Sequence, residues 1–133
     1  MFRLRSSLAA IASMATLIAQ GAAAQSSQPI VISVGLSEDH FSPSYIELKH
    51  GQSYVLRVTN TGHQAHALSA RAFFASSIIA AADASVVRNG GIEVAPGESA
   101  DLGFVASAPG AYEVHCPHPF HSALGMKGQI VVR

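Results

Sequence analysis

The chain contains little cysteine, little net charge and, after its first 24 residues, no long apolar run. Its single cysteine, Cys116, cannot close an internal disulfide. Lys and Arg number eight, as do Asp and Glu, so no basic excess favours nucleic-acid binding. No segment after residue 24 is apolar for long enough to cross a bilayer. These shortages exclude a disulfide scaffold and leave a nucleic-acid-binding or membrane-spanning domain without support.

The first 24 residues are typical of a secretory signal peptide. Arg3 and Arg5 precede an apolar run at residues 8–19, and three alanines at 22–24 form a small-residue cleavage site. The apolar run is too short for a stable membrane anchor. We therefore predict a signal peptide at residues 1–24, export to the periplasm, and one domain over residues 25–133. Cleavage would leave six Lys and Arg against eight Asp and Glu, a mildly acidic balance.

Short β-rich segments separated by Gly and Pro turns fill most of the remaining chain. The spacing of apolar residues in 71–87 suits one or two helical turns better than alternation. This pattern predicts an all-β fold, an antiparallel Greek-key β-sandwich of about 7–8 strands with a short helical insert near residues 71–87. The strands are expected at residues 30–34, 45–49, 53–59, 66–68, 92–94, 100–106, 112–116 and 128–132.

Three residues with soft or borderline donor atoms stand close together near the C-terminus. His121 follows Cys116 by five positions, and Met126 follows His121 by five. A lone Cys is most simply a buried thiol. A thiolate, an imidazole and a thioether on one loop instead suit copper, and one further histidine would complete a trigonal Cys-His-His site with a weak axial Met.

Four upstream histidines are candidates for the missing donor. His40 and His50 lie in connections, where an ordinary polar surface role is the simpler interpretation. His63 and His66 both follow the strand that is expected to end near Asn60. Spacing alone does not decide between His63 and His66.

The sequence resembles the cupredoxin family of type 1 blue copper proteins, which includes plastocyanin and azurin. The resemblance rests on Asn60-Thr61-Gly62 leading into His66 and on the motif Cys116-x4-His121-x4-Met126-Lys127-Gly128, with support from Pro96-Gly97-Glu98 and Pro109-Gly110-Ala111-Tyr112. In this family the first histidine stands six residues after the asparagine, which selects His66 over His63. The resemblance implies one copper ion, cycling between Cu(I) and Cu(II), held by His66, Cys116, His121 and axial Met126.

The family comparison also implies a function, which is one-electron transfer between redox partners rather than catalysis. Partners would dock near His121, Phe120 and Leu124, and we expect a monomer. The additional imidazoles of His63 and His118 motivate an alternative, copper storage, delivery or resistance. The resemblance assigns no role to His118, which stays open as a further ligand. A hydrolase with Cys116 as nucleophile lacks a nearby Asp or Asn to orient its base.

Overall fold

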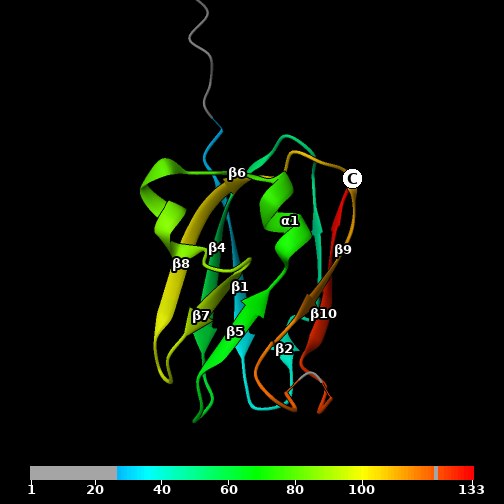
Figure 1. The fold of residues 1–133 in the computed structure, drawn as a ribbon. Helices are drawn as coiled ribbons and strands as arrows, with labels where there is room; N and C mark the ends of the chain where they lie inside the picture. Colours follow the sequence, from blue (N-terminus) through cyan, green and yellow to red (C-terminus); the bar gives the residue numbers. More distant parts are fainter. Residues whose placement is uncertain (1–26, 122) are drawn as a thin grey trace, which may run out of the picture.

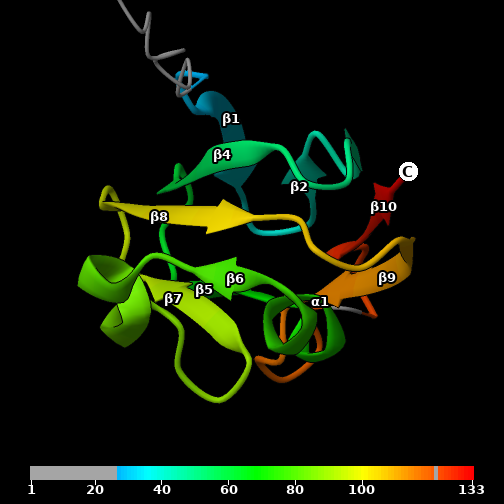
Figure 2. The same ribbon diagram turned by 90° about the horizontal axis from the view of Figure 1, so that it is seen from above.

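A computed structural model describes residues 27–121 and 123–133 of the chain. These residues form two five-stranded sheets, and the inward side chains of both sheets belong to one hydrophobic core. Seen from above, strands of the two sheets form two layers with the core between them (Figure 2). The all-β sandwich is therefore confirmed. The expected signal peptide at residues 1–24 lies outside the described residues.

The first sheet has the strand order β2-β1-β4-β8-β6. Strand β1 runs parallel to β4, and β4 runs antiparallel to β8. The strands of this sheet are β1 (Ile30–Leu36), β2 (Phe41–Ser42), β4 (Ser53–Asn60), β6 (Ile78–Ile79) and β8 (Ser99–Val105).

The second sheet has the strand order β3-β10-β9-β5-β7. Strand β3 is parallel to β10, whereas the other pairs are antiparallel. The two parallel pairs depart from the expected antiparallel sandwich, because β3 leaves the layer of β1 and β2 and joins the other sheet beside β10. The strands of this sheet are β3 (Tyr45–Leu48), β5 (His66–Ser69), β7 (Gly91–Val94), β9 (Gly110–His115) and β10 (Lys127–Val132).

The alternating sequence of β4 explains its place at the centre of the first sheet. Tyr54, Leu56, Val58 and Asn60 are buried, whereas the intervening Arg57 is exposed. Such alternation is expected for a strand with one face on the core. The last inward position is polar, and Asn60 stands where the chain leaves the sheet toward His66.

The predicted helical insert is confirmed, although a short strand divides it. Helix α1 (Arg71–Ser76) is followed by β6 and then by a 3-10 helix at Ala81–Val86. The buried ring of Phe73 holds α1 on the core. The Asp83 carboxylate accepts a hydrogen bond of 2.8 Å from the backbone N–H of Gly103, which ties the 3-10 helix to β8.

The two ends of the sandwich are formed by different elements. The loop between β9 and β10 and the start of β5 lie at one end, whereas α1 and the C-terminus lie at the other (Figure 1). Residues far apart in the sequence therefore meet at the loop end. Among the described residues, no helix is both long and apolar enough to cross a bilayer.

Candidate metal centre

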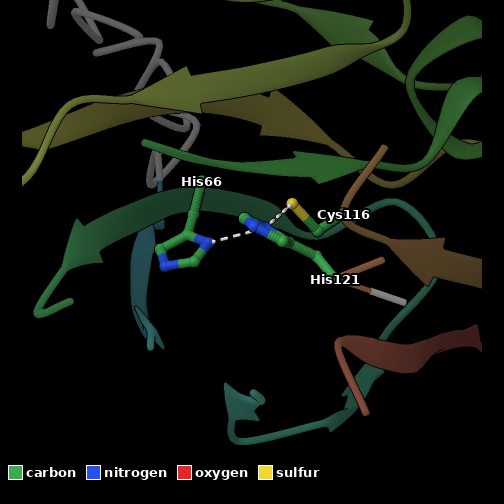
Figure 3. Close-up of side chains that lie close together, drawn as sticks. All are labelled: His66, Cys116 and His121. Atoms are coloured by element: carbon green, nitrogen blue, oxygen red, sulfur yellow. Dashed lines mark hydrogen bonds between the residues drawn. The ribbon is translucent and has the colours of Figure 1, made fainter. Parts of the chain in front are cut away.

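Three side chains that can donate to a metal ion meet at the loop end of the sandwich. Ligand atoms of His66, Cys116 and His121 all lie within 4.8 Å of one another. The two histidine Nδ1 atoms are 3.1 Å apart, and the Cys116 Sγ is 3.3 Å from the His121 Nδ1. In Figure 3 the His121 ring lies between the other two side chains.

Strand geometry brings Cys116 and His66 together. Cys116 directly follows β9, and both Cys116 and Val114 are buried on the core side. His66 is the first residue of β5, the strand next to β9 in the sheet. The backbone N–H of Ala67 lies 3.5 Å from the Cys116 Sγ, as a donor to that sulfur. Such hydrogen bonds tune the basicity and redox potential of a metal-bound thiolate.

The loop that carries His121 is closed by backbone hydrogen bonds. The N–H of Met126 donates to the His121 carbonyl at 3.1 Å, and the N–H of Cys116 donates to the Met126 carbonyl at 3.2 Å. Gly125 has a φ of 117°, and a Cβ there would come within 2.7 Å of the Asp39 carbonyl oxygen. This close approach requires glycine. The two bonds keep the three expected loop donors in one short segment.

Met126 is fully buried, one residue before β10 begins. Its backbone bonds link it directly to Cys116 and His121. A methionine held here is consistent with the expected weak axial donor. The assignment of Met126 as a ligand remains a proposal.

Burial favours the uncharged form of the His66 imidazole. Removal of the imidazole from water lowers the pKa of His66, and the neighbouring His121 adds to this effect. The neutral ring, which has a free nitrogen lone pair, is therefore favoured. Metal ions bind histidine in this neutral form.

Asn60 holds the turn that leads into His66. Its side-chain N–H groups donate to the carbonyls of Gln64 at 2.7 Å and Val94 at 2.9 Å. Its side-chain oxygen accepts the N–H of Gly62 at 2.9 Å. These three bonds explain physically why an asparagine stands at this strand end, since they satisfy a buried amide and fix the turn.

The other histidines lie outside the three-residue cluster. His118 lies 3.4 Å from the Glu93 carboxylate through its Nε2, and its ring stacks on His121 at a centroid distance of 5.4 Å. His63 is exposed. The rings of His40 and His50 bond to Asp39 and to the Ser107 carbonyl, respectively.

Sequence reasoning missed two residues that contact the histidines of the cluster. Glu38 reaches His66 from the connection between β1 and β2, and Gln64 reaches His121 from the turn before β5. Neither residue carries a periodic or motif signal in the sequence. Gly62 is the one local hint, because it leaves room for the Glu38 carboxylate.

A separate cleft of about 840 Å³ lies beside the cluster. Ser69 and Glu93 belong to strands of the second sheet, whereas Arg71 begins α1 and Arg88 lies between the 3-10 helix and β7. His115 lines this cleft and directly precedes Cys116 in the sequence. The cleft contains none of the three clustered donors, so we place the candidate site at the cluster.

Comparisons with solved structures show that other proteins share this fold. The auracyanin of Roseiflexus castenholzii is 22% identical, with a TM-score of 0.57 over 77% of this chain and 96% of that one. Auracyanin A of Chloroflexus aurantiacus, described as a "blue" copper protein, is 25% identical, with a TM-score of 0.55 over 80% and 100%. A multicopper oxidase from Campylobacter jejuni is 18% identical, with a TM-score of 0.61 over 80% of this chain and 31% of the oxidase.

The search of curated proteins returns no match. The family model of the cupredoxin-like domain matches residues 7–132. This range starts inside the expected signal peptide, so the boundary after Ala24 stays a prediction. A buried thiol with two imidazoles and a nearby thioether fits copper chemically. The family and this donor set indicate one copper ion, and the chain belongs to the cupredoxin family.

Proposed function

We propose that this chain is an exported mononuclear copper protein that carries one electron between redox partners in the periplasm. Copper is held by His66, Cys116 and His121, with Met126 as the axial ligand. The observation that carries the proposal is that His66, Cys116 and His121 each bring one ligand atom to within 4.8 Å of the other two. When bound, copper supplies a reversible one-electron couple.

The scaffold favours electron transfer because the donor residues are fixed before the metal arrives. His66 and Cys116 are fully buried at the sheet, and Met126 is fully buried at the start of β10. Backbone hydrogen bonds close the loop around His121. Donors that move little between two oxidation states keep the reorganisation small. Their burial also excludes water from the thiolate.

We assign electron transfer between the copper site and a partner to the exposed edge of the His121 ring. Of the three clustered residues, His121 alone is partly exposed. Phe120 is 80% exposed and Leu124 is 66% exposed on the same loop. Apolar side chains around an accessible ligand suit short-lived docking of a redox partner, since little charged surface must be desolvated there.

The test is to load the mature protein with Cu(II) and record its absorption spectrum and redox potential. We expect an intense thiolate-to-copper band in the visible region and a reversible one-electron potential, as for a trigonal Cys-His-His site. A protein without such a band, in which Cys116 titrates as a free thiol, would refute the proposal. Copper that leaves quickly to a mild chelator would favour storage or delivery instead.

Leu124→Glu tests the docking surface without a known partner. Electron self-exchange between two copies requires the His121 edges of both copies to approach each other. A negative charge at position 124 of each copy therefore opposes this approach. We expect the self-exchange rate to fall at least about tenfold at low salt, because facing like charges are costly. Nuclear magnetic resonance line broadening in mixtures of reduced and oxidised protein measures this rate.

Ile78→Glu is the matched control for Leu124→Glu. Ile78 is 63% exposed, but it lies in β6, far from the loop end (Figure 1). This variant should keep the self-exchange rate of the unmodified protein. If both variants slow the exchange equally, net charge rather than the location of the added charge controls the encounter.

A further inference from the structure

The His66 imidazole has one nitrogen whose role the metal site leaves open. Its Nδ1 faces His121, whereas its Nε2 is buried and lacks a hydrogen-bond partner among the described residues. A buried N–H without an acceptor costs about 1–3 kcal/mol. The Glu38 carboxylate is 3.8 Å from this Nε2, within ion-pair range but too far for a hydrogen bond.

Glu38 is anchored by the turn that leads into His66. Its carboxylate accepts hydrogen bonds from the backbone N–H of His63 and, at 3.3 Å, from that of Gln64. A Cβ at Gly62 would lie 2.5 Å from the same carboxylate, so glycine makes room for it. The bond from His63 is the main cause that lowers the pKa of Glu38. A glutamate carboxyl group that accepts two backbone N–H bonds is an anion at neutral pH.

The same turn serves the second imidazole. The side-chain oxygen of Gln64 lies 3.2 Å from the His121 Nε2 and accepts its N–H. With a proton on each Nε2, the Nδ1 lone pairs of His66 and His121 face one another next to the Cys116 sulfur. Two lone pairs at this distance repel each other unless a cation lies among them. The outer contacts thus prepare the donor atoms for a metal ion.

We infer that Glu38 is the positioning residue of the metal centre. It accepts the Nε2–H of His66 after a movement of less than 1 Å, as expected from normal hydrogen-bond lengths, and it fixes the turn that presents Gln64 to His121. Acceptors on the outer nitrogen of a metal-bound histidine set its tautomer and raise its basicity. Because this acceptor is anionic, it favours Cu(II) over Cu(I). The inference rests on the proposed copper function.

The test compares Glu38→Gln and Glu38→Ala with the unmodified mature protein. Loss of the negative charge should weaken Cu(II) binding relative to Cu(I) binding by about tenfold, which raises the one-electron potential by ~59 mV. We expect both variants to show this rise. Glu38→Ala should additionally lose about tenfold or more in Cu(II) affinity, because it removes the acceptor.

A second measurement uses the metal-free protein. Ring-nitrogen NMR should show the Nε2–H tautomer of His66 in the unmodified chain and a mixture of tautomers in Glu38→Ala. The amides of His63 and Gln64 should exchange faster with solvent in this variant, because their acceptor is gone. These readouts keep the test independent of copper loading and show whether a variant is folded.

Asp39→Asn is the matched control. Asp39 is the neighbouring carboxylate, and its side chain bonds to Ser37 and His40 instead of to the turn. The Asp39→Asn variant should leave the one-electron potential and the His66 tautomer unchanged. Unchanged potential and tautomer in both Glu38 variants would overturn the inference. Failure of the unmodified protein to form a thiolate–copper band would instead refute the proposed function, and the tautomer data would still decide the role of Glu38.

Discussion

Cys116→Ser should abolish the visible absorption band of the copper-loaded protein and reduce Cu(I) affinity more than about 100-fold. Loss of a residue that only hydrogen-bonds to a metal ligand already lowers metal affinity about 10–100-fold. The Cys116→Ser change removes one of the proposed ligands itself. A serine oxygen is a hard donor that binds Cu(I) poorly and gives no thiolate charge transfer. Competition with a Cu(I) chelator and an absorption titration measure both effects.

His118→Ala is the control for the cysteine variant. His118 lies in the same loop, but its Nε2 faces the Glu93 carboxylate, and His118 is not one of the three clustered donor residues. We expect its band and its Cu(I) affinity to stay near those of the unmodified protein. A band that survives in Cys116→Ser, or that disappears in His118→Ala, would contradict the assignment of the ligands.

Phe73→Ala should lower the free energy of unfolding by about 3–5 kcal/mol, the range for removal of a buried aromatic ring. Phe73 is fully buried, and its ring makes edge contacts with Phe74, Phe104 and Tyr112 at centroid distances of 5.4, 5.4 and 5.5 Å. The loss is a large share of the roughly 5–15 kcal/mol that keeps a domain folded. Urea denaturation measures this loss, and we expect the slope of the free energy of unfolding against urea concentration to be unchanged.

The consequence for the metal centre should be small while the variant stays folded. Helix α1 lies at the end of the sandwich opposite to the loop (Figure 1), so we expect the copper spectrum of Phe73→Ala to be retained below its unfolding midpoint. Phe120→Ala is the control, because a residue that is 80% exposed should change stability by less than about 0.5 kcal/mol. Equal destabilisation by the two variants would show that the Phe73 ring cluster does not hold the core.

Local patterns were sufficient to predict eight of the ten strands, all except β2 and β6, and the part of the site that lies on the loop before β10. Alternation in β4 indicates which side chains are buried, because successive residues of a strand point to opposite faces. Cys116 and His121 lie on one short loop, so their proximity follows from chain connectivity. The insert was recognised from its changed spacing, although the pairing of β6 with β8 depends on a contact more than 20 residues away.

Contacts between distant segments were beyond the reach of such patterns. His63 and His66 both follow the end of β4 within a few residues, but His66 begins β5 and is buried beside Cys116, whereas His63 is exposed. Family resemblance, rather than spacing, favoured His66. Glu38 meets His66 only because the connection after β1 packs against the turn before β5. No periodicity in a single sequence encodes this packing.

The sequence alone thus determined the residue types, their spacing on the β9–β10 loop and the alternation of the strands. Each of these features depends only on residues that are neighbours in the chain. The parallel pairings of β1 with β4 and of β3 with β10 were not, because crossing between layers is a property of the whole sandwich. The positions of Glu38 near the His66 Nε2 and of Gln64 at the His121 Nε2 depend on that same packing. They became visible once the two sheets brought the turn, the loop and Glu38 to one end.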